Sequence, residues 1–203
     1  MSGPAAPGSA GVVFVDRDGT IIVERNYLAD PAQVALERGA LAGLSRLAAA
    51  GYALIVLTNQ SGIARGYFDL ATAQRVNARV NDLLAEAGIA VAGWYICPHG
   101  DGDGCDCRKP APGLALQAAR ELGIAIDGAW VIGDKMSDAR LADAIGGRAI
   151  VVTTGHGAGA VDAARAAEIP VVADLSEAAD VILGPVADAH ARAGSRGLTL
   201  PAG

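Results

Sequence analysis

The sequence predicts an α/β fold, a three-layer, Rossmann-like parallel sheet flanked by helices. Short apolar runs alternate along the chain with stretches of helical periodicity, and the runs are apolar throughout instead of alternating with polar residues. Strands of that kind are buried on both faces, as in a parallel sheet covered by helices on each side. No internal repeat and no linker to a second domain interrupts the alternation.

Six apolar runs are expected to form the strands. In chain order they are 12–15 (VVFV), 53–58 (ALIVLT), 94–97 (WYIC), 129–133 (AWVIG), 149–153 (AIVVT) and 180–183 (DVIL). Apolar residues at three- and four-residue spacing predict helices over 39–50, 69–87, 111–122 and 137–145. Gly88 and Gly123 directly follow two of these helices, where a glycine that ends the helix is expected.

The length of 203 residues favours one domain, which we place at residues 11–193. Residues 1–10 and 194–203 are rich in Gly, Ala, Pro and Ser, so we expect a disordered N-terminal segment and a flexible tail. Trp94 and Trp130 fall in strand patterns and are interpreted as core residues.

The charge and the start of the chain restrict the partners. A net charge of −6 argues against a nucleic acid or an anionic membrane as the main partner, although a small anionic substrate remains compatible with it. The first residues lack the basic and apolar regions of a secretory signal, and no stretch predicts a membrane span. We therefore expect a cytoplasmic protein, and a monomer.

The richest chemistry follows the first predicted strand, in DRDGT, residues 16–20. This could be a polar turn or the start of a calcium loop, but the twelfth position of such a loop would be Tyr27 instead of a glutamate. Two carboxylates two residues apart at a strand end can have different catalytic roles. One of Asp16 and Asp18 can act as a nucleophile and a Mg²⁺ ligand, and the other as an acid and a base.

Polar residues follow other predicted strands as well. In TNQSG, residues 58–62, a hydroxyl, an amide and backbone N–H groups are suited to holding phosphate oxygens, although a simple polar cap is the alternative. The pair Arg108 and Lys109 and the segment 134–138 (DKMSD) lie at the same expected edge, where an acid can complete a Mg²⁺ site. The segment 154–159 (TGHGAG) lacks the spacing of a phosphate loop and is interpreted as a flexible connection, with His156 at the surface.

All three cysteines of the chain lie in CPHGDGDGCDC, residues 97–107. Cys97, His99, Cys105 and Cys107 supply three thiolates and one imidazole, the ligand set of a closed tetrahedral zinc site. A disulfide would leave one thiol over and suits a cytoplasmic protein poorly. We therefore predict a structural Zn²⁺ that holds the backbone of the next two residues, Arg108 and Lys109.

Taken together, D-x-D-G-T, T-N-Q, R-K and G-D-x-x-x-D resemble the haloacid dehalogenase superfamily of phosphohydrolases over roughly residues 11–153. The resemblance implies an enzyme that hydrolyses phosphomonoesters through a phospho-aspartate on Asp16, with Asp18 as acid and base. It also implies that Thr58 and Lys109 hold the phosphoryl oxygens. Asp16, Asp134 and the backbone carbonyl of Asp18 would bind the catalytic Mg²⁺. The segments between the motifs are too short for a large cap domain.

The zinc loop narrows the resemblance to two families, the heptose-bisphosphate phosphatases and the histidinol phosphatases. The fuller segments FVDRDGTI, TNQSGIARG, CRKPAPG and GDKMSD resemble the former, which implies removal of the 7-phosphate of D-glycero-D-manno-heptose 1,7-bisphosphate. The five residues between His99 and Cys105 match the histidinol phosphatases, so histidinol phosphate or another small sugar phosphate is the alternative.

The same resemblance assigns substrate contacts. The residues implied to face the substrate are Glu24, Arg25, Asn26, Tyr27, Asn59, Gln60, Ser61, Arg108 and Lys135. Outside the enzymes, the competing hypothesis is a catalytically silent, zinc-stabilised binding module. Metal-dependent turnover of a phosphomonoester would separate the two classes.

Overall fold

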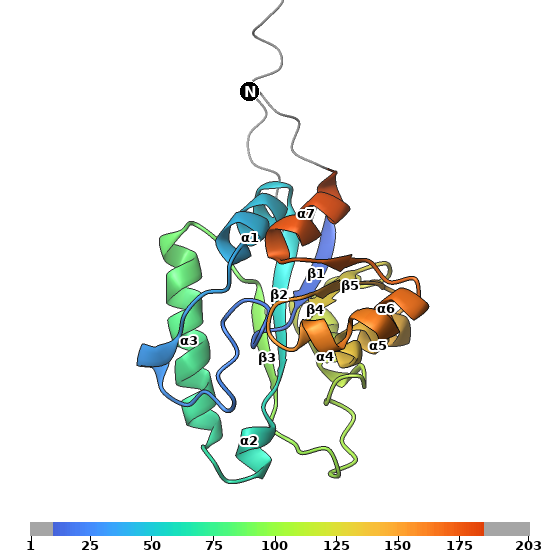
Figure 1. Ribbon diagram of the computed structural model, residues 1–203. Coiled ribbons are helices and arrows are strands. Elements are labelled where there is room, and N and C mark those ends of the chain that lie inside the picture. The colour runs from blue at the N-terminus through green and yellow to red at the C-terminus, as the bar shows by residue number, and fades with distance from the viewer. Residues whose placement is uncertain (1–9, 185–203) are drawn as a thin grey trace, which may run out of the picture.

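The computed structural model describes residues 10–184, so the two predicted loose ends lie outside the described residues except for Ala10. Six parallel strands form one sheet in the order β3-β2-β1-β4-β5-β6 (Figure 1). Their bounds are Gly11–Val15 (β1), Tyr52–Asn59 (β2), Gly93–Cys97 (β3), Trp130–Gly133 (β4), Arg148–Val152 (β5) and Val171–Val172 (β6). The predicted parallel α/β sheet is confirmed.

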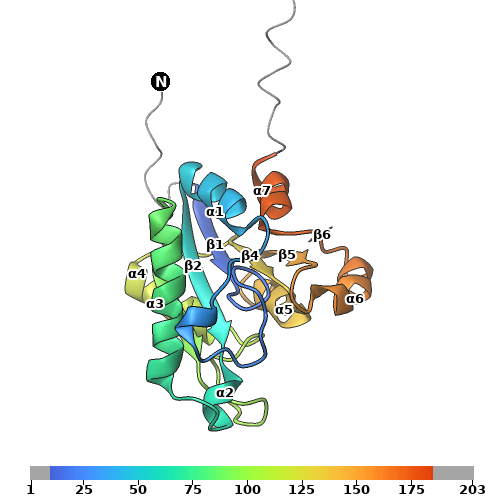
Figure 2. The same ribbon diagram turned by 60° about the vertical axis from the view of Figure 1, so that its left-hand side comes forward.

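Helices cover both faces of the sheet, which Figures 1 and 2 show from two directions. The α-helices are Ala40–Ala49 (α1), Ser61–Ala64 (α2), Leu70–Glu86 (α3), Gly113–Leu122 (α4), Met136–Ala144 (α5), Val161–Ala166 (α6) and Leu175–Leu183 (α7). Two short 3₁₀ turns, Pro31–Gln33 (η1) and Gly157–Gly159 (η2), complete the described chain. Helices α1, α3 and α7 pack on one face and α4 and α5 on the other, which makes three layers.

The continuous apolar runs explain the two cores. In β1, Val13 and Val15 belong to the core beneath α1, α3 and α7, whereas Val12 and Phe14 belong to the core beneath α4 and α5. Successive side chains of a strand point to opposite faces, so a strand covered on both sides must be apolar at every position. Trp94 and Trp130 are half-buried and pack against the first core, as predicted.

One predicted strand, 180–183, is wrong, because these residues form the last turns of α7. The side chain of Asp174 begins this helix by accepting the backbone N–H groups of Ser176 and Glu177 at 2.9 and 3.3 Å. A four-residue apolar run has no periodicity of its own that separates a strand from a buried helical turn. The sixth strand is the shorter pair Val171–Val172.

The two predicted helix-ending glycines are in place. Gly123 ends α4 in the left-handed conformation, and Gly88 follows α3 with a φ of 74°. Helix α5 directly follows β4, and only α2 and α3 separate β2 from β3, so the described chain holds no large cap domain. Among residues 10–184, no helix is long and apolar enough to span a bilayer.

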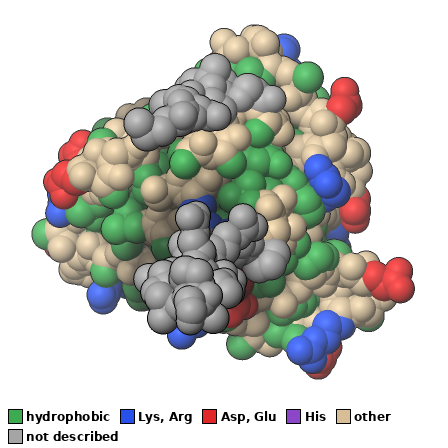
Figure 3. Space-filling model, turned by 90° about the horizontal axis from the view of Figure 1, so that it is seen from above, with side chains coloured by type: hydrophobic (Ala, Val, Ile, Leu, Met, Phe, Trp, Pro, Cys, Tyr) green, Lys and Arg blue, Asp and Glu red, His purple; other side chains and the backbone are tan. Residues whose placement is uncertain are grey.

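The carboxyl ends of the strands lie at the lower edge of the sheet in Figure 1, beside α2. Figure 3 views the opposite end, where cationic and anionic side chains are spread around the rim of the described surface and form no patch of one sign. The polar chemistry gathers at the lower edge instead, as a parallel sheet predicts.

Candidate active site

Three carboxylates meet where β1 and β4 end. Asp16 follows β1, Asp134 follows β4, and Asp138 lies in the first turn of α5. These two strands are neighbours in the sheet, so an oxygen of each carboxylate lies within 4.8 Å of the others, and all three residues are less than 9% exposed. So many buried acids require a counter-charge.

Part of that counter-charge is Lys109, which is itself only 4% exposed. Its ammonium forms ion pairs with Asp16 at 2.8 Å and with Asp138 at 2.7 Å, and it donates a hydrogen bond to the carbonyl of Leu57 at 2.7 Å. Burial alone would lower the pKa of Lys109, but Asp138 and Asp16 outweigh it and raise that pKa above its ordinary value. Lys109 therefore stays charged between the two acids.

Asp134 is less well compensated than Asp16 and Asp138. Its Oδ2 accepts the backbone N–H of His156 at 2.7 Å, but its buried Oδ1 has no hydrogen-bond partner, and the ammonium of Lys135 lies 4.0 Å from it. Burial, and then the negative charge of Asp16, raises the pKa of Asp134 to about 7. An unpartnered carboxylate oxygen that faces two other acids is what an oxygen-coordinated cation such as Mg²⁺ requires.

The loop after β1 has no room for a side chain next to this cluster. Gly19 adopts a φ of 75°, and a Cβ there would lie 2.3 Å from Asp134 Oδ2 and 2.9 Å from the Cα of Gly155. The hydroxyl of Thr154 donates to the carbonyl of Gly19 at 2.6 Å. The segment 154–159, interpreted from sequence as a flexible connection, thus packs against the predicted nucleophile loop. The imidazole of His156 is half-exposed.

Two side chains after β2 support the site instead of pointing freely into it. Asn59 donates to the carbonyl of Lys109 at 3.1 Å and accepts the N–H of Lys109 at 3.0 Å, which fixes that backbone. Gln60 donates to Asp18 Oδ2 at 2.7 Å and to the hydroxyl of Thr58 at 2.8 Å. Asp18 is the predicted acid and base, so Gln60 takes part in orienting it.

A cleft of about 570 Å³ opens above these residues. The predicted catalytic and substrate-binding residues that line it are Asp16, Asp18, Glu24, Asn26, Tyr27, Asn59, Gln60, Ser61, Arg108, Lys109 and Lys135, and Cys105 of the predicted zinc site also lines it. Outside the zinc site, three predicted residues do not line it: Thr58 and Asp134 are buried beneath, and Arg25 is exposed. Sequence reasoning missed His156 and Asp101 at the rim.

One wall of the cleft is a strained loop. Asn26 and Tyr27 adopt positive φ values of 46° and 62°, and the N–H of Asn26 donates to the carboxylate of Glu24 at 2.7 Å. The ring of Tyr27 packs edge-on against Tyr67, with 4.8 Å between centroids. Glu24 also lies 3.9 Å from Lys135, so acidic and basic groups alternate along this wall.

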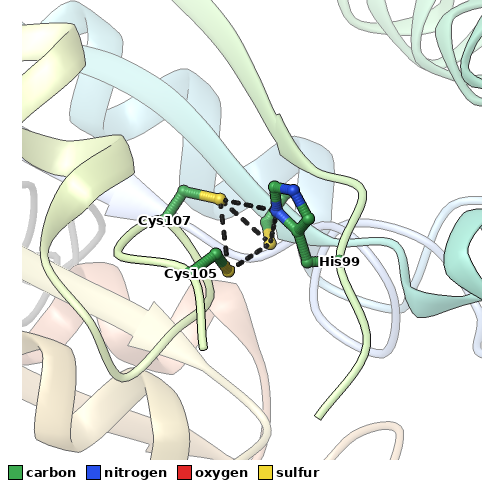
Figure 4. A group of neighbouring side chains, drawn as sticks. His99, Cys105 and Cys107 are labelled. Carbon is green, nitrogen blue, oxygen red and sulfur yellow. Dashed lines mark hydrogen bonds between the residues drawn. The ribbon is translucent and has the colours of Figure 1, made fainter. Parts of the chain in front are cut away.

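The opposite wall carries the cysteine cluster, in which no two cysteines are disulfide-bonded (Figure 4). The three sulfurs lie 3.2–3.8 Å apart, and His99 Nδ1 lies 3.2 Å from Cys107 and 3.7 Å from Cys97. A tetrahedral ion with bonds of about 2.3 Å to sulfur separates its sulfurs by about 3.8 Å. Burial raises the pKa of Cys97 and of Cys107, whereas at Cys105 desolvation is outweighed by hydrogen bonds with Cys107, Arg108 and Cys97, which lower the pKa of that thiol. The cluster matches the ligand set of one zinc ion.

Comparison with known proteins assigns the family. A family profile described as HAD-hydrolase-like matches residues 106–178. A Pseudomonas aeruginosa protein named D-glycero-beta-D-manno-heptose-1,7-bisphosphate 7-phosphatase is 39% identical over 150 residues, which are 73% of this chain and 84% of that protein. The chain belongs to the haloacid dehalogenase superfamily, in the family of these phosphatases. It is therefore a hydrolase of phosphoric monoesters, and the silent binding module is set aside.

Other relatives of this phosphatase agree. A Photorhabdus laumondii protein of the same name is 36% identical over 87% of this chain and 91% of its own. The crystal structure of D,D-heptose 1,7-bisphosphate phosphatase from B. bronchiseptica, complexed with magnesium and phosphate, has a TM-score of 0.75. It is 32% identical to this chain and covers 85% of it and 97% of its own chain. The corresponding enzyme from Burkholderia thailandensis has a TM-score of 0.64 at 30% identity, over 86% of this chain and 99% of its own.

Two buried contacts of this phosphatase's site were not foreseen. Asp138 was noted in the sequence, but its ion pair with Lys109 was not foreseen, because 29 residues separate the two. Arg17, between the two predicted catalytic acids, is fully buried and contacts both Asp18 and Asn77 of α3. Arg17 stands between two aspartates, so no local signal in the sequence distinguishes it from an exposed arginine.

Proposed function

We propose that this phosphatase removes the 7-phosphate of D-glycero-β-D-manno-heptose 1,7-bisphosphate through a phospho-aspartate on Asp16. The observation that carries the mechanism is the Asp16 carboxylate at the floor of the cleft, 2.8 Å from the buried ammonium of Lys109 and beside Asp134. The names of the relatives support the substrate and its β anomer.

Asp16 is held through one of its two carboxylate oxygens. Its Oδ1 accepts the backbone N–H of Arg17 at 2.8 Å and lies 2.8 Å from the ammonium of Lys109, which leaves Oδ2 for the attack on phosphorus. We propose that the buried charge of Lys109 offsets that of the phosphate. Lys109 and Thr58 would then hold the phosphoryl oxygens.

Asp16, Asp134 and the backbone carbonyl of Asp18 would hold the catalytic Mg²⁺, and the unpartnered Asp134 Oδ1 fits this assignment. Bound there, Mg²⁺ would neutralise phosphate charge and polarise the phosphorus–oxygen bonds. Without a cation next to it, a dianionic phosphate would be repelled by the three acids.

Asp18 handles the protons. As the bond from Asp16 to phosphorus forms and the bond from phosphorus to the sugar oxygen breaks, the protonated Asp18 gives its proton to that oxygen. The resulting Asp18 carboxylate then takes a proton from the water whose oxygen attacks phosphorus. This attack breaks the bond to Asp16, releases phosphate and returns both residues to their first states.

The walls of the cleft select the substrate. We propose that Glu24, Asn26, Tyr27, Ser61 and Lys135 contact the sugar, because they line the cleft beside Asp16. Arg108 would bind the far phosphate. In the structure Arg108 donates to Asp101 at 2.9 Å and to the carbonyl of His99 at 3.3 Å, so the loop itself orients it.

Cys97, His99, Cys105 and Cys107 would bind a structural Zn²⁺, since their ligand atoms lie within 4.8 Å of one another. All four positions of a tetrahedral ion would be filled by protein, which leaves no place for a reacting water. Its contribution is to hold the loop that carries Arg108 and Lys109.

The test is phosphate release with Mg²⁺ from the α and β anomers of heptose 1,7-bisphosphate and from histidinol phosphate. We expect the highest kcat/KM for the β anomer and release of one phosphate per sugar. The short loop between His99 and Cys105 is the one observation that favours histidinol phosphate. A higher kcat/KM for that substrate, or release of both phosphates from the sugar, would contradict the proposal.

A further inference from the structure

Arg17 is a fully buried arginine between the two carboxylates that the proposed mechanism uses. Burying a guanidinium is costly unless a carboxylate and further hydrogen bonds compensate for the lost water. Among the described residues, Asp18 is the one that forms an ion pair with Arg17, with 2.7 Å between Nη2 and Oδ2. The buried guanidinium of Arg17 thus holds the side chain of Asp18, which lines the cleft.

The contact has the geometry of a fork. Arg17 Nη2 donates to Oδ1 and Oδ2 of Asp18 at 3.0 and 2.7 Å, and Nε donates to Oδ2 at 3.2 Å. Two or more parallel hydrogen bonds from a planar guanidinium fix both the position and the plane of a carboxylate. Lysine, a point charge on a flexible stem, does not fix the plane.

The guanidinium is anchored in turn to helix α3. Its Nη1 donates to Asn77 Oδ1 at 2.6 Å, across 60 positions of sequence. Asn77 is 5% exposed, and its Oδ1 occupies the side of the guanidinium that points away from Asp18. Helix α3 thereby determines where the fork lies.

From the cleft side, Gln60 donates to Asp18 Oδ2 at 2.7 Å. Oδ2 therefore accepts two short hydrogen bonds, from Arg17 and Gln60, whereas Oδ1 accepts one at 3.0 Å. Of the two oxygens, Oδ1 is therefore the less engaged.

We propose that Arg17 and Asn77 are positioning residues that hold the Asp18 carboxylate in line with the leaving oxygen of the phosphate ester. Neither residue lines the cleft, so each would act on the reaction only through Asp18. The inference rests on the proposed function, because it assumes that Asp18 protonates the leaving group. It predicts that loosening this contact harms esters that need a proton and spares those that do not.

The test measures kcat/KM over a series of substituted phenyl phosphates, from phenyl to 4-nitrophenyl phosphate. This parameter reports the steps up to departure of the leaving group. For Asn77→Leu we expect kcat/KM to fall about tenfold with phenyl phosphate and less than about threefold with 4-nitrophenyl phosphate, because phenolate needs the proton more. In Asn77→Leu, kcat/KM should therefore fall more steeply with the pKa of the leaving phenol than it does in the wild type.

Asn81→Leu is the matched control. Asn81 lies one helical turn further along α3 and accepts from the indole of Trp94 at 3.2 Å, with no contact to Arg17. For Asn81→Leu, kcat/KM should depend on the pKa of the leaving phenol as steeply as it does for the wild type. Arg17→Lys, which keeps the charge and loses the fork, should steepen the dependence in the same way. It serves as the second variant should Asn77→Leu not fold.

A uniform loss across the series, or an equal steepening in Asn81→Leu, would overturn the positioning role while leaving the phosphatase intact. Absence of phosphate release by the wild type from both heptose 1,7-bisphosphate and every aryl ester would instead overturn the proposed function, and this inference with it.

Discussion

At the ends of β1 and β4, three carboxylates are placed by backbone that the sheet itself determines, and a buried lysine lies among them. In the loop after β3, three thiols and an imidazole converge just as closely, but only Cys97 belongs to a strand. Cys105 and Cys107 are partly exposed, on a stretch without regular structure. Both clusters suit a metal, but they are built in opposite ways.

This difference in construction predicts which of the two clusters needs a bound ion to keep its shape. The acidic site contains an internal cation, Lys109, and is framed by two cores, so its shape does not require Mg²⁺. The loop 100–104, GDGDG, brings no apolar side chains, so little besides an ion can hold it. Metal removal should therefore stop chemistry at the first cluster and loosen structure at the second.

Asp16→Asn, at the acidic site, should have the largest effect on turnover. An amide cannot attack phosphorus, so kcat for the bisphosphate should fall by at least about 10⁴-fold, the order found when a covalent nucleophile is removed. Thermal unfolding should show that the variant stays folded. Asp143→Asn, at an exposed position of α5, is the control and should turn over normally. Turnover within tenfold of wild type would refute the role of Asp16.

Lys109→Met removes the buried cation of the acidic site and should have the second largest effect on turnover. We expect a fall in kcat of about a thousandfold, since a preorganised charge at the phosphoryl group is lost. The free energy of unfolding should fall by about 3–5 kcal/mol, because Asp138 keeps its buried charge without a partner. Denaturant unfolding in EDTA measures this effect. Lys135→Met, at a half-exposed lysine, should change the free energy of unfolding little.

The stability deficit of Lys109→Met should depend on pH. Burial already raises the pKa of Asp138 to about 6 with Lys109 beside it, well above the ordinary value of about 3.9. A carboxyl with a raised pKa in the folded state costs stability as pH rises through that value and costs nothing when protonated. The deficit should therefore be smallest near pH 4 and grow above pH 6. A deficit independent of pH would contradict the pairing of Lys109 with Asp138.

Cys105→Ser tests the loop and should have a smaller effect. We expect bound zinc to be lost and kcat/KM to fall about 10–100-fold, as when residues that support a site are altered. Metal content is read by elemental mass spectrometry, and Gly102→Ser, which has open space for a side chain on the same loop, is the control. Undiminished turnover by a zinc-free variant would contradict the supporting role.

Arg108→Met should have the smallest and most selective effect. Arg108 shares a backbone with Lys109, yet its side chain lies at the surface, paired with Asp101. We expect KM for the bisphosphate to rise about tenfold with kcat unchanged, and no change for 4-nitrophenyl phosphate, because uniform binding is lost. Arg120→Met, at an exposed position of α4, is the control. Equal losses with both substrates would show that Arg108 serves the chemistry and not the far phosphate.

Much of this could be predicted from sequence, because strand ends in a parallel sheet converge wherever apolar runs are followed by polar residues. Asp16 and Asp134 were named on this ground and Lys109 on the family resemblance, and the structure brings the three side chains together. The cysteine cluster was evident from residue type and spacing alone, since four ligands within eleven positions leave few other interpretations.

What escaped prediction depends on contacts between distant segments. Nothing local indicates that Asp138 pairs with Lys109, or that Asn77 of α3 meets Arg17. Asn59 and Gln60 were expected to contact the substrate, yet their amides are engaged with Lys109 and Asp18. Sequence placed these residues at the site, but only the packed chain shows what each one touches.

The most direct test of the account is to trap the reaction by rapid acid quenching while the heptose bisphosphate is being turned over, and to locate the phosphoryl group by peptide mass spectrometry. We predict one added phosphoryl group, on the peptide that contains Asp16, and none in Asp16→Asn. Turnover with no phosphorylated peptide, or with the group on another residue, would contradict covalent catalysis by Asp16.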